Sequence, residues 1–165
     1  MPCLFSWKDG LPAGAVRHQM VDHCDLFATL LDVANAVPDE GMQKEIHSPG
    51  ESYLPILTGD KETWQDVFFG EYGNARVIRT ETRKLIRRYP GPNGHYPDEF
   101  YDLERDAGEQ ENRMDDAAYR AEIETLSQRL DAHFANYEIE GRSGREIDRV
   151  PKCNPGHAPW EKSPQ

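Results

Sequence analysis

Residues 100–112 read FYDLERDAGEQEN, and this stretch decides how the second half of the chain folds. It connects the end of an apolar strand to an acidic turn, and this turn leads directly into a segment with helical periodicity. Beyond it, apolar side chains recur at steps of four, three, four, four and three, at Tyr119, Ile123, Leu126, Leu130, Phe134 and Tyr137. This spacing places them on one face of a helix that Asp115 or Asp116 can cap.

Upstream of that stretch, short apolar segments alternate with residues that favour turns. The expected strands cover residues 67–72, 75–80, 84–89 and 99–103. They are separated by Gly73-Asn74, by residues 81–83 and by the loop at 90–94. Closely spaced strands with short turns are typical of an antiparallel meander. A helix laid across one face of such a sheet gives an α+β fold.

The first sixty residues show weaker signals. Residues 4–7 are expected to form a short buried strand, and residues 15–21 a weak extended piece. Asp22 can cap a helix whose apolar positions recur at spacings of three and four, so we expect this helix to be largely buried and to end by Pro38. These positions are Leu26, Phe27, Leu30, Leu31, Val33 and Ala34.

Two further segments complete the expected organisation. Residues 39–49 are polar and predict a loop, whereas residues 51–59 predict a short helical or irregular apolar plug that ends at Gly59. The tail at 141–165 has no periodicity and is expected to wrap along the surface in an extended form. The three cysteines, Cys3, Cys24 and Cys153, are far apart in the sequence, so free thiols are expected.

The charge pattern narrows the possible partners. A net charge of −11 argues against binding to nucleic acid or to an anionic membrane. Residues 98–131 hold twelve acidic and four basic side chains, whereas residues 76–88 hold six basic side chains and one acid. Two interpretations stay open for the basic run. It can be a charged sheet face beside an acidic helix, or a local anion site.

Catalytic and metal-binding motifs are absent from the sequence. The six histidines are scattered, and no HExxH, CxxC, GxSxG or phosphate-loop pattern occurs. The acids of residues 102–109 lack the spacing and the glycine of a calcium loop, so turn and capping roles are expected for them. Taken alone, the residues predict an α+β domain with no visible catalytic site.

Five segments in chain order nevertheless resemble the C-terminal part of the sulfatases, the type I sulfuric ester hydrolases of the alkaline-phosphatase-like superfamily. They are DLFATLLDVAN at 25–35, GESYLPILTG at 50–59, WQDVFFGE at 64–71, RVIRT at 76–80 with KLI at 84–86, and EFYDLERDAGEQEN at 99–112. Ala28 and Asn35 depart from the proline and glycine that are usual in the first segment. The resemblance covers about residues 1–138.

The resemblance implies a fold and a division of the chain. Residues 1–60 would be the tail end of the family's N-terminal α/β domain. Residues 61–140 would form a small antiparallel sheet packed by one long C-terminal helix, and 141–165 an extended tail. The helix at 26–33 would then lose the large parallel sheet on which it packs in a full-length member. Its apolar face would be exposed, and independent stability would be marginal.

The resemblance also implies a function. A complete sulfatase uses a formylglycine nucleophile and a divalent cation, usually calcium. The C/S-x-P-S-R motif that yields formylglycine does not occur in this sequence. The chain is therefore expected to form a wall of the substrate cleft, to contain no catalytic or metal-binding residue, and to be inactive alone. Its expected partners are the missing N-terminal catalytic domain and a sulfated small molecule or glycan.

Four residues are candidate substrate contacts: Arg76, Arg79, His95 and His157. Arg76 and Arg79 lie three apart in an expected strand, so their side chains should point to opposite faces and at most one can reach a shared anion. An alternative function is a non-catalytic binding module for sulfated or other anionic ligands. Another is an accessory subunit that completes a catalytic partner.

Overall fold

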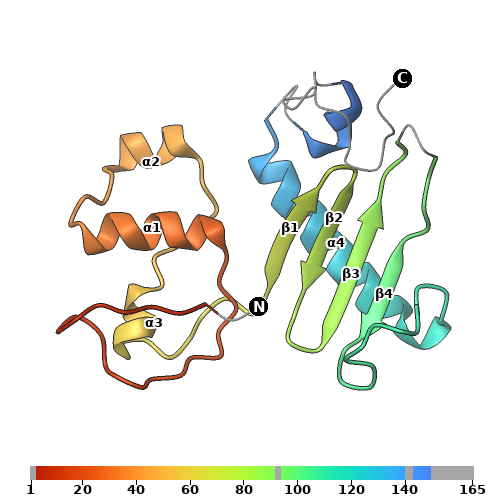
Figure 1. Cartoon of the computed structure of the whole chain (residues 1–165). Coiled ribbons are helices and arrows are strands. Elements are labelled where there is room, and N and C mark those ends of the chain that lie inside the picture. The colour runs from red at the N-terminus through yellow and green to blue at the C-terminus, as the bar shows by residue number, and fades with distance from the viewer. Residues whose placement is uncertain (1–2, 92–93, 140–142, 150–165) are drawn as a thin grey trace, which may run out of the picture.

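The computed structural model describes residues 3–91, 94–139 and 143–149. Figure 1 shows two regions. The helical region, residues 3–60, contains three short helices. The sheet region, residues 67–139, contains a four-stranded sheet with one long helix behind it. The sheet region matches the expected α+β arrangement. Among the described helices, none is both long and apolar enough to cross a membrane.

The sheet is an antiparallel meander, as predicted. Its strands are β1 (Phe68–Tyr72), β2 (Ala75–Arg79), β3 (Arg83–Arg88) and β4 (Glu99–Asp102), hydrogen-bonded in the order β1-β2-β3-β4. The register places Phe69 opposite Ile78, Ile78 opposite Leu85, and Leu85 opposite Phe100. Because alternate residues of a strand share a face, these four side chains form one row across the sheet.

The long helix α4 (Arg120–Tyr137) packs against that row (Figure 1). Asp116 accepts a hydrogen bond from the Ala118 amide and begins a 3₁₀ turn, η1 (Ala117–Tyr119), that leads into it. The predicted stripe is confirmed, because Tyr119, Ile123, Leu126 and Leu130 are buried and Phe134 packs at the margin of the core. Ile78, Leu85, Phe100 and Leu130 have no exposed surface.

The helical region begins with α1 (His23–Val33), capped as predicted by Asp22. The Asp22 carboxylate accepts from the amides of Cys24 and Asp25, and the Asp25 carboxylate accepts from the Asp22 amide. Asp25 also accepts from the amide of Glu51 and the side chain of Gln65, so one buried carboxyl joins three segments. α3 (Leu54–Thr58) is the expected plug, with Ile56 buried.

Several expectations for the helical region are wrong. Residues 39–49 contain a helix, α2 (Glu40–Ile46), because the Asp39 carboxylate caps it by accepting from the Met42 amide. Residues 4–7 form no strand and Leu4 is 93% exposed, because no neighbouring strand pairs with them. The apolar face of α1 is not buried, since Leu30 is 58% and Phe27 49% exposed.

That exposure agrees with what the family resemblance implies. In a full-length member α1 would pack on a large parallel sheet, and the described residues form only the small antiparallel one. The extended tail is also corrected in part, because residues 144–149 form a 3₁₀ helix, η2 (Gly144–Arg149). Residues 150–165 lie outside the described residues. Of the three cysteines, Cys3 and Cys24 are free thiols, and Cys153 lies outside the described residues too.

A few contacts hold the two regions together, partly through the connecting residues 61–66. The Trp64 indole donates to the Met20 carbonyl at 2.8 Å, and Arg129 of α4 pairs with Asp66 at 2.7 Å. His47, just after α2, has its Nε2 2.7 Å from the Asn136 carbonyl. His133 of α4 is half-buried, and its ring stacks on Phe69 with centroids 3.8 Å apart.

Candidate functional site

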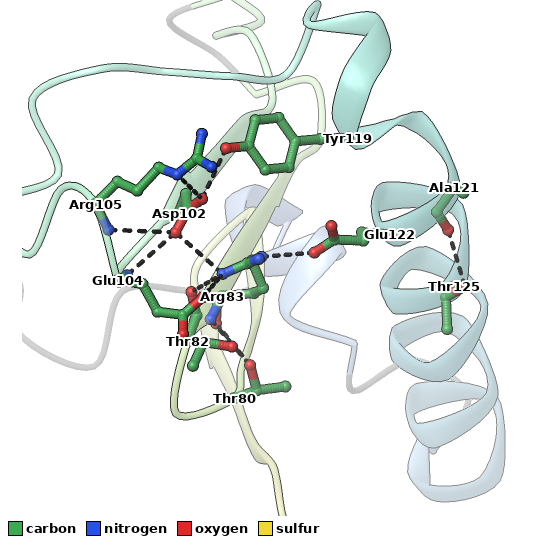
Figure 2. A network of polar contacts seen from close by, with 10 residues as sticks. All are labelled: Thr80, Thr82, Arg83, Asp102, Glu104, Arg105, Tyr119, Ala121, Glu122 and Thr125. Atoms are coloured by element: carbon green, nitrogen blue, oxygen red, sulfur yellow. Dashed lines mark hydrogen bonds and ion pairs between the residues drawn. The ribbon is translucent and has the colours of Figure 1, made fainter.

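Arg83 is the centre of the polar network that joins β3 to the stretch 100–112 and to α4 (Figure 2). Its Nη1 lies 3.0 Å from Asp102 and 3.0 Å from Glu104, and its Nε donates to Glu122 of α4 at 2.5 Å. Burial acts to lower the pKa of Arg83, but the hydrogen bonds to Glu122 and Glu104 raise it overall. Arg83 is therefore a fixed cation that holds three elements together.

Asp102 is the inner member of this network and is 4% exposed. The Tyr119 hydroxyl donates to its Oδ2 at 2.7 Å, and the Glu104 amide donates to its Oδ1 at 3.1 Å. The hydrogen bond from Tyr119 holds the pKa of Asp102 below its ordinary value and raises the pKa of Tyr119. A carboxylate held ionised by such partners serves as a structural anion and is a poor general acid.

The remaining basic side chains of residues 76–88 are also matched by acids, with Arg79 as the exception among the described residues. Lys84 pairs with Glu109 at 2.6 Å, Arg88 with Glu99 at 2.5 Å and Arg87 with Asp98 at 3.7 Å. These acids come from β4 and the loops that flank it more than from α4. The pairing favours the interpretation of a charge-matched sheet over that of an anion site spanning the whole run.

The three candidate substrate contacts that the structure describes lie in different environments. Arg76 and Arg79 point to opposite faces of β2, as the strand alternation predicts, and Arg76 is 4% exposed whereas Arg79 is exposed. His95 is exposed in the loop after β3, with its Nε2 2.9 Å from the Arg88 carbonyl. His157 lies outside the described residues. The structure therefore does not bring Arg76, Arg79 and His95 to one point, and their substrate roles stay predictions.

A surface hollow of about 180 Å³ lies over the 102–113 loop, where sequence reasoning placed no site. Its lining consists of Asp102, Arg105, Asp106, Gln110, Glu111, Arg113 and Tyr119. Three carboxylates and two guanidiniums face it, and Arg113 is already paired with Glu111 and Asp116. Such a mixed lining selects neither an anion nor a cation.

The described residues do not fit the family's cofactors. No three His, Cys, Asp or Glu side chains converge to hold a metal ion in the part of the chain that the structure describes. Burial raises the pKa of the Cys24 thiol, and Asp22 and Asp25 raise it further, so this thiol is protonated and a weak nucleophile.

The fold and the sequence signature define the C-terminal part of a sulfatase. The family model described as "N-sulphoglucosamine sulphohydrolase, C-terminal" matches residues 1–136, and the chain belongs to this family. No curated protein matches the chain.

Solved structures of the same superfamily share the fold. A protein solved with its substrate D-glucosamine-2-N,6-O-disulfate is 25% identical, with a TM-score of 0.55 over 71% of this chain and 24% of its own. A 2-O GAG sulfatase is 26% identical, with a TM-score of 0.53 over 72% and 25%.

A third similar structure is the phosphonate monoester hydrolase of Agrobacterium radiobacter. It is 27% identical, with a TM-score of 0.54 over 68% of this chain and 24% of its own. The chain thus spans about a quarter of the length of each of these three structures.

Proposed function

We propose that this chain is the substrate-cleft wall of a sulfatase, which docks through α1 on a catalytic α/β domain and has no activity of its own. The observation that carries the proposal is the family match over residues 1–136 together with an uncovered apolar face on α1. The division into 1–60, 61–140 and 141–165 belongs to the same proposal, with the first part as the docking element.

The docking face is formed by side chains that a monomeric domain normally covers. Phe27, Leu30 and Val33 of α1 are 49%, 58% and 39% exposed, and Met42 of α2 is 53% exposed. A contiguous exposed apolar patch marks an interaction site. In contrast, the polar side of α1 is buried within the chain, where Asp25 and Thr29 hold residues 51–53. The helix is therefore anchored on one side and open on the other.

Substrate recognition is proposed for Arg79 and His95, the two candidates in the described residues whose side chains are exposed. Arg79 is a cation without an ion-pair partner in the described part of the chain, which leaves it available for a sulfate oxygen. His95 lies on a loop, where specificity residues concentrate. His157 stays a proposal from its place in the tail. Arg76 can contribute only if it leaves its present carboxylate partners.

The proposed lack of activity is tested by incubating the isolated chain with an aryl sulfate and calcium. A parallel assay uses an aryl phosphonate monoester, because a phosphonate monoester hydrolase is among the similar structures. We expect hydrolysis of both esters at the protein-free rate. Turnover above that rate, lost on treatment with a chelator, would show that these 165 residues contain an active site after all.

A second function, a binding module for sulfated ligands, is favoured by one observation, the unpaired and exposed Arg79. Titrating the isolated chain with D-glucosamine-2-N,6-O-disulfate distinguishes this binding module from the cleft wall. A binding module predicts salt-sensitive binding that Arg79→Ala abolishes. Arg105→Ala is the matched control, because Arg105 is 83% exposed and its replacement removes the same charge from the loop that follows β4.

If this chain is only the wall of a cleft, the titration shows no saturable binding, because most of the contacts to the sugar belong to the absent catalytic domain. Binding that survives Arg79→Ala but is lost in Arg105→Ala would contradict both the absence of binding expected of a cleft wall and the assignment of the ligand site to Arg79. It would move the ligand site to the hollow over residues 102–113.

A further inference from the structure

Arg76 is the most deeply buried cation of the basic run, with 4% of its surface exposed. Its Nε donates to the Glu71 carboxylate at 2.7 Å, and its Nη2 lies 3.3 Å from Glu138. The guanidinium lies 4.1 Å from the ring centroid of Phe134. Burial acts to lower the pKa of Arg76, but Glu71 and Glu138 raise it overall, so the cation is held charged between two carboxylates.

The same guanidinium reaches the segment that follows α4. Its Nη2 donates to the Ser143 hydroxyl at 3.2 Å. Arg76 therefore contacts Glu138, just past the end of α4, and Ser143, at the start of the described piece 143–149.

Glu71 completes the arrangement from the neighbouring strand. One of its carboxylate oxygens accepts from Arg76, and the other accepts from the Gly144 amide at 3.1 Å. The approach is so close that a Cβ on Gly144 would lie 2.5 Å from the Glu71 carboxyl carbon. Arg145 covers Tyr89, which follows β3, with its guanidinium 4.4 Å from the ring centroid. The 143–149 piece is thus attached to β1, to β2 and to the end of β3.

We propose that Arg76 and Glu71 form a clasp that fastens residues 143–149 to the sheet at the end where the β1–β2 turn lies (Figure 1). A buried guanidinium is strongly favoured only when its hydrogen bonds to carboxylates are complete. The clasp is closed when Ser143 and Gly144 lie against the sheet. The Ser143 hydroxyl then accepts from Arg76, and the Gly144 amide donates to Glu71. The described part of the chain therefore ends at this end of the sheet.

The clasp is sensitive to acid through Glu138. The hydrogen bond with Ser143 lowers the pKa of Glu138, and Arg76 lowers it further. The charged groups that face Arg76 are Glu71 from β1 and Glu138 from the end of α4, with Arg145 above Tyr89. Protonation of Glu138 at low pH removes one carboxylate partner of the guanidinium, so the clasp is expected to loosen in acid.

The test measures amide hydrogen exchange at Gly144 and the rate of trypsin cleavage after Arg145 in the full chain. Arg76→Met keeps most of the side-chain volume and removes the hydrogen bonds. Gly144→Ala forces the Glu71 carboxylate away without touching Arg76. Both variants are expected to raise the Gly144 exchange rate and the Arg145 cleavage rate roughly tenfold, a loss typical for hydrogen bonds to a charged group.

Arg79→Met is the matched control, because it removes a guanidinium from the same strand on the opposite face. It should leave both rates unchanged. Cleavage after Arg105, on the exposed 102–113 loop, reports general unfolding and serves as the internal reference. Should Arg76→Met fail to fold, Gly144→Ala decides alone. Unchanged rates at Gly144 and Arg145 in folded Gly144→Ala would overturn the clasp, as would an equal acceleration after Arg105.

Discussion

The sheet region and the helical region use similar numbers of apolar side chains in opposite ways. In the sheet region, Ile78, Leu85, Phe100 and Leu130 are fully buried between the sheet and α4. In the helical region, Leu30 and Phe27 are about half exposed, and Tyr53 and Ile56 are the only large apolar residues that the structure describes there as buried. The sheet region has its own buried core, whereas the apolar side chains of α1 are left largely exposed.

Leu130 on the apolar stripe of α4 and Leu30 on that of α1 give the sharpest test of this difference in burial. Leu130→Ala should lower the free energy of unfolding by about 3 kcal/mol, because it leaves a cavity in a closed core. Leu30→Ala should change it by less than about 0.5 kcal/mol, because that side chain already contacts solvent. Urea unfolding of both variants, followed by circular dichroism, measures the two values. Equal losses would mean that α1 is covered in solution.

The buried carboxylate of the sheet region should matter more than a carboxylate between the regions. Asp102→Asn keeps the shape but removes the charge that Arg83 and Tyr119 share, so we expect a clearly lower urea midpoint at pH 7. Asp66→Asn is the control, because Asp66 is 74% exposed and its pair with Arg129 is a surface pair. A shift for Asp66→Asn as large as that for Asp102→Asn would contradict the central role of the network.

Exposed apolar surface should map to the helical region. A fluorescent dye that binds apolar surface should bind the full chain and bind less to a shorter chain that begins at Gly50. Tyr72→Ser tests the other region, because Tyr72 is 92% exposed on β1 and a single exposed aromatic residue makes no patch. Equal dye binding by the full and shortened chains would show that the helical region has no open apolar face.

Acidification should affect the two regions in opposite directions, with the smallest expected change. The hydrogen bond from Tyr119 lowers the pKa of Asp102, so its stabilisation is present above the ordinary carboxyl pKa of about 4 and is lost as the pH falls through the lower folded value. Burial raises the pKa of Asp25, so its contribution is lost as the pH rises through the raised folded value.

Between pH 7 and about pH 5, corrected amide exchange near Asp25 should therefore slow slightly, while exchange in β3 and β4 stays constant. Below the ordinary carboxyl pKa, exchange in β3 and β4 should accelerate. Exchange that accelerates near Asp25 and in the sheet at the same pH would show that Asp25 is not the group that distinguishes the regions.

Much of the sheet region could be predicted from the sequence, because its signals are local. Turn residues separate the strands, and the stripe from Tyr119 to Tyr137 has one helical period over five steps. The cap at Asp22 was equally readable, since a carboxylate before the first turn satisfies free amides wherever the helix packs. The seven-residue α2 was missed because it is too short to show a stripe and depends on its Asp39 cap.

The candidate site was less predictable, because burial and pairing depend on partners that are distant in the sequence. Arg76 and Arg79 are residues of the same type, and the alternation of the strand predicted only that their side chains lie on opposite faces of the sheet. Whether Arg76 meets a ligand or Glu71, Glu138 and Ser143 depends on where α4 ends and the chain continues. No local pattern carries that information.

The sequence by itself determined the family of this protein, the order of its strands and the apolar face of its last helix, because these follow from short-range spacing and turn chemistry. Only the tertiary structure decided that Asp102 of the stretch 100–112 is the buried partner of Arg83 and Tyr119, and that Arg76 is paired with Glu71 and Glu138. Both outcomes depend on what lies opposite a side chain, and solvation and packing act through space.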